Sequence, residues 1–270
     1  RSDGTDFGKF VYGGGSMKGY PAFLKKEFFE YTKTYKIFIV LMIFAVFGIT
    51  NPLIAKLLPE ILENLITDSV TITLPEPTAY DAWTQFFKNA TQMGLIVMVI
   101  LFSGVLSSEL SKGTLINLLT KGLSRTAVIL SKYTCMVLIW TASIVLCFGL
   151  TYGYTLYLFP KDKISNLLFS VFCLWMFGLF LLAALLFSAT LTRSSFGCLL
   201  ITGVIVVICM IINIIPAVHR YNPISLSTDN MGLIMNSIEA SSLYRTIMIS
   251  CLLSLIFVSL SVVIFRKKQL

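Results

Sequence analysis

The stretch Ile164–Leu191, which reads I-S-N-L-L-F-S-V-F-C-L-W-M-F-G-L-F-L-L-A-A-L-L-F-S-A-T-L, decides the fold class of this chain. It contains no Asp, Glu, Lys or Arg, and it exceeds the roughly 20 apolar residues that an α-helix needs to cross about 30 Å of hydrocarbon. Polar and apolar residues do not alternate along it, as they would in a transmembrane β-strand. The stretch therefore predicts a membrane-spanning helix.

Five further segments are equally apolar and equally free of Asp, Glu, Lys and Arg: Ile37–Ile54, Thr91–Leu106, Thr134–Phe159, Phe196–Ala217 and Thr246–Phe265. Apolar residues make up 56% of the chain and charged residues only 13%, whereas about 25% of the residues in a soluble domain are charged. The mean hydropathy of +0.85 agrees with this pattern. We therefore predict an all-α polytopic membrane protein with six transmembrane helices.

The first sixteen residues have a different character, because Gly13-Gly14-Gly15-Ser16 directly precedes Met17. We interpret residues 1–16 as the remnant of a tag and flexible linker, with a natural disordered leader as the alternative. Residues 17–270 are then expected to form a single transmembrane domain. The sequence leaves open the structure of two outer segments, Ala55–Ala90 and Pro216–Tyr244. In the second, Met231–Ile238 is compatible with a surface helix or a re-entrant one.

The basic residues predict an orientation, because cytoplasmic loops of membrane proteins carry an excess of Lys and Arg. With a cytoplasmic N-terminus, the cytoplasmic segments hold 13 such residues and the outer segments hold Lys56, Lys88, Lys161, Lys163, Arg220 and Arg245. This distribution predicts a multi-pass protein of the plasma membrane with both termini in the cytoplasm. The basic excess then reflects topology and contact with anionic membrane lipid, and no nucleic-acid partner is expected.

Several chemistries are not supported by any motif. The chain has no G-x-x-x-x-G-K-[ST] phosphate-binding loop, so we expect no ATP binding by this route. The six cysteines form no C-x-x-C pair, and His219 is the single histidine, so we expect no metal site. The chain is therefore expected not to be an enzyme and to hold no cofactor of its own. The six predicted spans also lack the ionisable groups that ion-coupled transporters use, so the energy for any transport would come from outside the membrane.

An amphipathic segment precedes the first span. Within Met17–Lys36, an apolar stripe runs along one side of a helix at Leu24, Phe28, Tyr31 and Tyr35, with Lys26, Glu30 and Lys33 opposite. A helix of this kind is expected to lie in the membrane interface with its apolar side toward the lipid. The alternative is a solvated helix with one apolar face.

The loop Ser107–Lys132 carries the strongest local signals. Thr114 is suited to cap a short helix that contains Leu115, Leu118 and Leu119, and Gly122 is suited to end it. Ser124 is suited to cap the next helix, which leads into the third span. A short apolar helix outside the membrane either docks on a partner or packs on its own bundle, and the physics alone leaves both open.

The same loop contains a recognisable string of residues: Glu109-x-x-x-Gly113-Thr114-Leu115, then Leu118-Leu119, Ser124-Arg125 and Lys132. This string resembles the first cytoplasmic loop of ABC-2 type permeases, the membrane subunits of a class of ABC exporters. The resemblance extends to the six spans, the interfacial helix and the basic end Arg266-Lys267-Lys268. The chain departs from the family pattern at Leu123, where members often carry Pro.

The resemblance implies that the loop is a coupling helix, which docks into a separate ABC ATPase subunit. Glu109, Gly113, Thr114, Leu115, Leu118, Leu119 and Arg125 would then form the ATPase-coupling site. Two ATPase subunits, which bind ATP and magnesium, would serve this chain together with a second copy or a homologous permease. The transported substrate would be a hydrophobic or amphipathic peptide, drug or lipid.

Hydroxyl groups on the third span, at Thr141, Ser143, Tyr152 and Tyr154, are candidates for lining the pathway of such an exporter. Two alternatives stay open. One is an integral membrane enzyme that acts on lipid, for which His219 with Asp229 or Glu239 is the available group of titratable residues. The other is a membrane assembly protein without transport activity.

Overall fold

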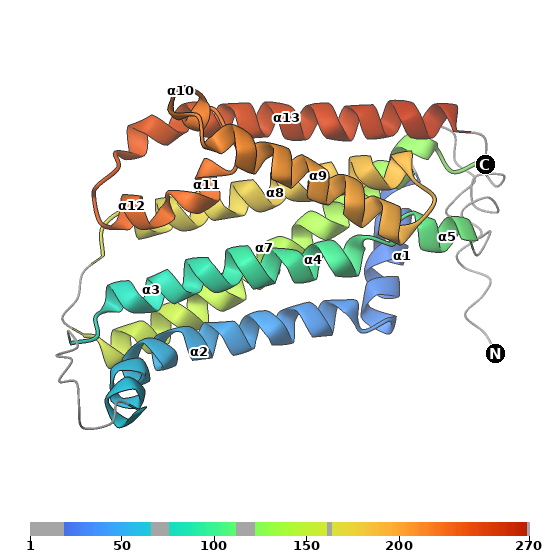
Figure 1. The fold of residues 1–270 in the computed structure, drawn as a ribbon. Helices are drawn as coiled ribbons and strands as arrows, with labels where there is room; N and C mark the ends of the chain where they lie inside the picture. The colour runs from blue at the N-terminus through green and yellow to red at the C-terminus, as the bar shows by residue number, and fades with distance from the viewer. Residues whose placement is uncertain (1–18, 66–75, 112–121, 161–163, 269–270) are drawn as a thin grey trace.

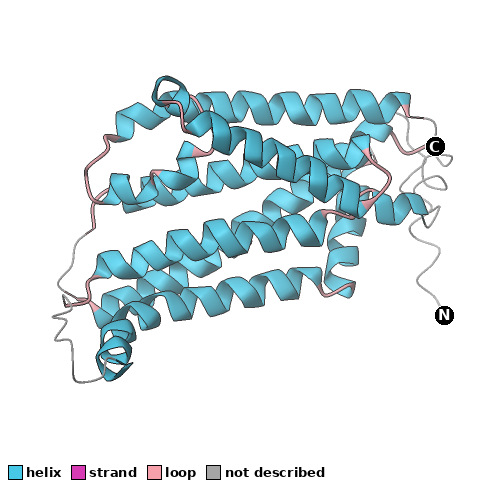
Figure 2. Cartoon of the chain, viewed as in Figure 1, coloured by secondary structure: helices cyan, strands magenta, loops and turns pink. Residues whose placement is uncertain are grey.

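A computed structural model describes residues 19–65, 76–111, 122–160 and 164–268, and in these residues the regular structure is helical, with no strand (Figure 2). The longer helices are α1 (Tyr20–Lys33), α2 (Lys36–Leu65), α3 (Ala79–Lys88), α4 (Leu95–Phe102), α7 (Arg125–Leu158), α8 (Leu167–Leu191), α9 (Ser195–Asn213) and α13 (Ala240–Lys267). The shorter elements are the π-helix η1 (Asn89–Gly94) and the α-helices α5 (Ser107–Ser111), α10 (Pro216–His219), α11 (Ser225–Thr228) and α12 (Asn230–Ile234).

Six helical segments of the described chain are long and apolar enough to cross a membrane, which confirms the predicted fold class. They are Lys36–Pro59, Ala79–Glu109, Arg125–Leu158, Leu167–Leu191, Ser195–Asn213 and Ala240–Lys267. They run lengthwise beside one another, whereas α1 lies across one end of the bundle, which we call the α1 end (Figure 1). The short helices α10, α11 and α12 lie at the opposite end, which we call the α12 end.

The second span is longer than the sequence predicted. Residues Thr91–Leu106 were expected to cross alone, but α3 extends the helical segment back to Ala79. The reason is a good helix start, because Thr78 and Asp81 form a capping box and α3 buries Trp83, Phe86 and Phe87 along one face. These polar and aromatic positions lower the average hydropathy, so the apolar run alone underestimates the length of the helical segment.

The core of the bundle forms around α8. In its most apolar window 67% of the residues are buried inside the protein, compared with 11% in α9 and 22% in α13. The centre is closely packed, because a side chain added at Gly178 of α8 would lie 2.2 Å from the Trp140 ring of α7. Helix α8 is therefore central, and α9 presents most of its surface to the surroundings.

A polar group inside the bundle compensates for a proline in α2. Pro52 has no N–H, so the carbonyl of Gly48, four residues earlier, loses its helical hydrogen bond. The Thr151 hydroxyl of α7 donates to that carbonyl at 3.2 Å and accepts from the Asn51 amide at 3.3 Å. Asn89, the first residue of η1, donates to the Asn51 side chain at 2.7 Å. This network joins three spans and lets α2 continue through the proline.

The segment between α9 and α13 packs inward. Leu226, Leu233 and Ile234 of α11 and α12 are fully buried, and both helices contact α8. Met231–Ile238 therefore does not form the free surface helix that the sequence left open. Its first part belongs to α12, which packs into the α12 end of the bundle.

Candidate functional site

Helix α1 positions the candidate site. Pro21 lies in its first turn, and the helix ends at Lys33, after which Tyr35 adopts a left-handed backbone with φ of 59°. At that turn the chain changes direction, so that α1 lies across the α1 end of the bundle and α2 runs along it (Figure 1). The face of α1 that packs against α7 and α2 buries Phe23, Glu27 and Tyr31.

The apolar stripe that was predicted to face lipid divides between the bundle and the surroundings. Tyr31 is buried, but Phe28 is 47% exposed and Tyr35 is 68% exposed, so the outer part of the stripe is available for contact with lipid. The side expected to face water is not solvated throughout, because Lys26 is partly buried and Glu27 beside it is only 1% exposed. The cause is a set of charged partners on α5 and α7.

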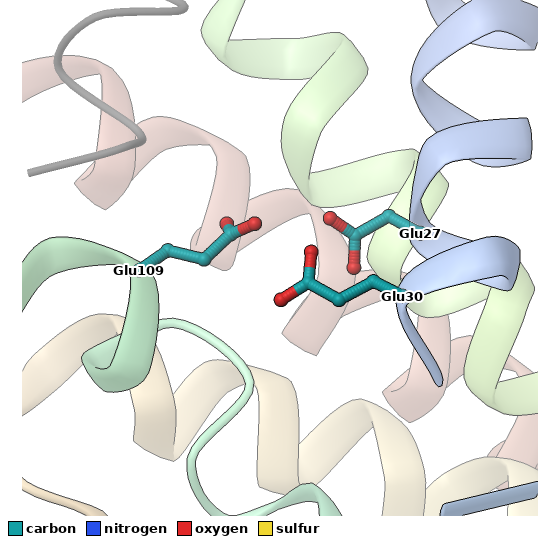
Figure 3. A group of neighbouring side chains, drawn as sticks. All are labelled: Glu27, Glu30 and Glu109. Carbon is teal, nitrogen blue, oxygen red and sulfur yellow. The ribbon is translucent and has the colours of Figure 1, made fainter. Parts of the chain in front are cut away.

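A buried ion cluster joins α1, α5 and α7, and we define it as Lys26, Glu27, Glu30, Glu109 and Lys132. The Lys132 ammonium lies 3.0 Å from both Glu27 oxygens and 2.8 Å from Glu109 Oε2. The Lys26 ammonium contacts Glu109, lies 2.6 Å from Glu30 and lies 3.2 Å from Glu27. Figure 3 shows Glu27 and Glu30 extending from α1 toward Glu109 of α5.

Burial makes this ion cluster strong and sensitive to change. Glu27 and Lys132 are each 1% exposed and Glu109 is 3% exposed, so water screens their interactions poorly. Burial raises the pKa of the Glu27 carboxyl above its ordinary value, and Lys132 opposes that rise. Burial would lower the pKa of the Lys26 ammonium, but the carboxylates of Glu27 and Glu109 outweigh it and raise that pKa. Each charge therefore depends on its partners to stay buried.

The three carboxylates also satisfy the spacing of a metal site, because one oxygen from each lies within 4.8 Å of the others. The two ammonium groups account for this convergence, since Lys26 contacts all three carboxylates and Lys132 contacts two of them. The arrangement is therefore an ion-pair network, and it gives no independent reason to place a metal there.

Two residues of the predicted coupling site lie on either side of residues 112–121, which are outside the described part of the chain. Glu109 belongs to the ion cluster, and Arg125 begins α7. Ser124 accepts a hydrogen bond from the Ala127 amide at 3.1 Å, which confirms the predicted cap of α7. Gly122 has a positive φ of 92°, a backbone conformation that favours glycine, and the helix that it was predicted to end lies outside the described residues. The other residues of the predicted site, Gly113, Thr114, Leu115, Leu118 and Leu119, lie outside the described residues.

The Arg125 side chain contacts this chain itself. Its guanidinium donates to the carbonyls of Phe265, Arg266 and Lys268 at 3.1, 2.9 and 2.7 Å. The last carbonyls of a helix lack intrahelical donors and carry partial negative charge, so a cation there stabilises the helix end. Arg125 thus ties the start of α7 to the end of α13.

We expect the variant Arg125→Met to loosen the last turn of α13, because three carbonyls lose a charged donor. The expected loss of stability is about 1–2 kcal/mol. Hydrogen exchange of the backbone amides of residues 264–268 should become faster, as measured by mass spectrometry. Arg266→Met is the matched control, because the Arg266 side chain is exposed. Equal exchange in the two variants would contradict the assigned cap.

The four candidate pathway residues do not share one environment. Ser143 is fully buried and donates to the Ile139 carbonyl, and Thr141 accepts from the Trp175 indole at 2.9 Å, so both are engaged inside the bundle. Tyr152 and Tyr154 are 45% and 43% exposed near the other end of α7. The structure therefore does not bring these four groups to one surface.

The structure does bring together His219 and Asp229, whose side chains lie 2.8 Å apart at the α12 end. Glu239 does not join them, and its carboxylate accepts from the Ser241 hydroxyl instead. The pair connects α10 to the end of α11, a contact that stabilises the local fold of the short helices.

Sequence reasoning missed Glu27 and treated Lys26 as a solvated residue. A signal was present, because Glu27 lies four residues after Phe23 and four before Tyr31, in the middle of a second apolar stripe. Lys132 likewise interrupts the otherwise apolar turns of α7. A single charge flanked in this way predicts a buried partner on another helix, but the sequence does not identify that partner.

The fold and the ion cluster define an all-α multi-pass membrane protein with a charged contact at the α1 end of its bundle. A comparison with the sequence patterns of known protein families finds no match. Among curated proteins, the chain is similar to the "Uncharacterized transmembrane protein YxlG" of Bacillus subtilis (strain 168). The two are 24% identical over 182 residues, which cover 66% of this chain and 70% of that protein. The similarity supports the conclusion that this chain is a membrane protein.

Proposed function

We propose that this chain is the membrane permease of an ATP-driven ABC exporter that moves hydrophobic or amphipathic substrates out of the cell. The resemblance of the loop Ser107–Lys132 to the coupling loop of ABC-2 type permeases suggests this function. The six spans and the crossing helix α1 are compatible with it. ATP hydrolysis would take place on separate ATPase subunits, and a second permease copy or a homologous one would complete the transporter.

One observation carries the proposal, namely that the ion cluster fixes both ends of this loop. Glu109 lies just before the residues 112–121, and Lys132 lies about two turns into α7, the helix that follows them. The two side chains pair at 2.8 Å, and both contact charged residues of α1. A loop that only connects two spans does not need buried ion pairs at its two ends. A loop that receives force from a partner needs ends that are held rigidly.

The cluster also gives a route by which force would reach the spans. Helix α5 overlaps the end of the second span, α7 is the third span, and α1 leads into the first span through the turn at Tyr35. A displacement of the loop would therefore move three spans together, because the ion pairs resist separation. The Arg125 cap would pass part of the same movement to the end of α13.

The test of this function is the composition and activity of the purified complex. We expect the chain, purified under mild conditions from its native membrane, to carry an ATPase with a phosphate-binding loop in about equal amount. We expect the complex to hydrolyse ATP and the chain stripped of that subunit to hydrolyse none. Mass spectrometry and a phosphate-release assay measure both. ATP hydrolysis by the stripped chain, or a complex without any ATPase, would overturn the proposal.

A further inference from the structure

Helix α1 has an exposed outer face, which we define as Lys25, Phe28, Phe29 and Lys33. The two lysines are exposed, and the two phenylalanines are 47% and 53% exposed. Phe28 lies three residues after Lys25, and Phe29 lies four residues from each lysine. The four side chains are therefore neighbours on one side of the helix, while its opposite side packs against α2 and α7.

This outer face lies at the level where the first span begins. Helix α1 lies across the α1 end of the bundle, and the first span starts at Lys36 (Figure 1). Exposed aromatic side chains continue across that junction, because Tyr35 is 68% exposed and its ring centroid lies 6.4 Å from that of Phe38, which is 53% exposed on α2. Aromatic rings and lysines at the start of a span are typical of the layer where hydrocarbon meets lipid headgroups.

The lysines of the outer face determine which charge its partner must have. Within the described residues, neither Lys25 nor Lys33 has a carboxylate partner, and the Lys25 ammonium lies 5.9 Å from the centroid of the Phe29 ring. The nearest acidic residue along α1, Glu30, pairs with Lys26 at 2.6 Å. The outer face is therefore complementary to an anion.

The surroundings of this face have the same sign. The other exposed charged residues of the α1 end, within the described chain, are all basic: Arg193, Arg266 and Lys267. Residues 1–18, 112–121 and 269–270, which adjoin described elements of this end, hold five basic residues and two acidic ones. Exposed charges at the α12 end have both signs, for example Asp81 and Arg245. A negative partner is therefore favoured at the α1 end in particular.

We propose that the outer face of α1 binds the headgroups of anionic phospholipids, with Lys25 and Lys33 contacting phosphate groups and the rings of Phe28 and Phe29 at the boundary with the acyl chains. A bilayer supplies both the negative charge for the lysines and an apolar layer for the rings, which a soluble anion does not. The predicted orientation agrees, because anionic lipids give the cytoplasmic leaflet its negative surface potential. This site does not depend on the proposed transport function.

The test uses the whole chain in lipid nanodiscs that contain a small fraction of a photoreactive phospholipid. Two probes, a phosphatidylglycerol and a phosphatidylcholine, carry the same diazirine near the glycerol and differ only in the headgroup. We expect the phosphatidylglycerol probe to label residues 21–35 at least tenfold more, as measured by mass spectrometry. The preference should decrease in 0.5 M NaCl, because salt screens exposed charges.

The double variant Lys25→Gln with Lys33→Gln should remove this preference and bring the two probes within twofold of each other. Each lysine beside an anionic surface contributes roughly fivefold in affinity. Lys25→Arg with Lys33→Arg should keep the preference. Lys56→Gln with Arg245→Gln is the matched control, because both residues are exposed at the α12 end. All three double variants should melt like the original chain, since the replaced side chains are exposed.

The variant Phe28→Ser with Phe29→Ser should reduce labelling by both probes, because it removes the apolar contact with the bilayer and keeps the lysines. Three results would overturn the proposal. One is a preference that survives the exchange of both lysines for glutamine. Another is loss of labelling when soluble glycerol phosphate is added in excess, which would indicate a site for a soluble anion. The third is equal labelling by the two probes together with loss of a co-purifying protein from the glutamine variant, which would indicate a protein contact.

Discussion

Replacing Lys132 with Met is expected to lower the free energy of unfolding by about 3–5 kcal/mol, because it leaves buried carboxylates without their main counter-charge. Methionine is as long as the lysine stem and favours helices, so α7 itself should tolerate the change. The loss would come from Glu27 and Glu109, which lie 3.0 and 2.8 Å from the Lys132 ammonium. A large decrease in melting temperature, measured on the purified protein in nanodiscs, is the expected result.

The matched control for this variant is Lys33→Met, because Lys33 lies on α1 but is exposed and its replacement should change stability by less than about 0.5 kcal/mol. The double variant Glu27→Gln with Lys132→Met should recover part of the loss, since one unpaired carboxylate disappears with its partner. If Lys132→Met melts like Lys33→Met, the ion cluster does not hold α1 to the bundle. The route of force through the cluster would then fail as well.

The double variant Leu118→Asp with Leu119→Asp is expected to abolish association with the ATPase while the spans stay inserted. In the proposed coupling helix these leucines fill a cleft on the ATPase, and two carboxylates there would be desolvated without partners at a cost of several kcal/mol. Binding would weaken by more than a hundredfold, since each 1.4 kcal/mol corresponds to a factor of ten. Pull-down yield and ATP hydrolysis measure the effect.

The single variant Asn117→Asp is the control for charge alone, because it adds a carboxylate to the same loop and keeps both leucines. It should keep the complex. Melting temperature separates the two roles that the loop sequence permits. If the leucines pack on their own bundle, the double variant will have a lower melting temperature. The fraction of the protein that remains folded will still bind the ATPase. Normal binding and normal hydrolysis in the double variant would show that the loop does not dock.

The spans and their order could be predicted from the sequence because each is a local pattern. The apolar run at Ile164–Leu191 ends at the same residue as α8 and begins three residues before it. Ser124 marks the start of α7 through a hydrogen bond with the amide of Ala127, three residues further along the chain. The start of α3 was missed because its polar residues conceal a helix that depends on a capping box. The continuation of α2 past Pro52 depends on Thr151, which lies about a hundred residues further along the chain.

The face of α1 could not be predicted for the same reason. Glu27 and Lys132 are 105 residues apart in the sequence, and Lys26 and Glu109 are 83 apart. A helical pattern shows which residues share a side, but it does not show that two glutamates will meet lysines from another helix. Phe28 and Tyr35 do lie on an apolar stripe of the sequence. The buried ion pairs on another side of α1 determine which face packs against the bundle.

The ion cluster also imposes an order in which contacts can form while the protein is being synthesised. Glu27 leaves the ribosome long before Glu109 and Lys132, so two spans must be made and the third begun before its buried pair with Lys132 can form. Until then the charges of α1 have only their partners within the same helix, Lys26 with Glu27 and Glu30, and hydrocarbon disfavours such charges, which keeps the helix in the aqueous layer beside the membrane. The arrival of Lys132 then closes the contact, so a nascent chain that fails to insert its third span would leave α1 exposed to proteases that remove incomplete membrane proteins.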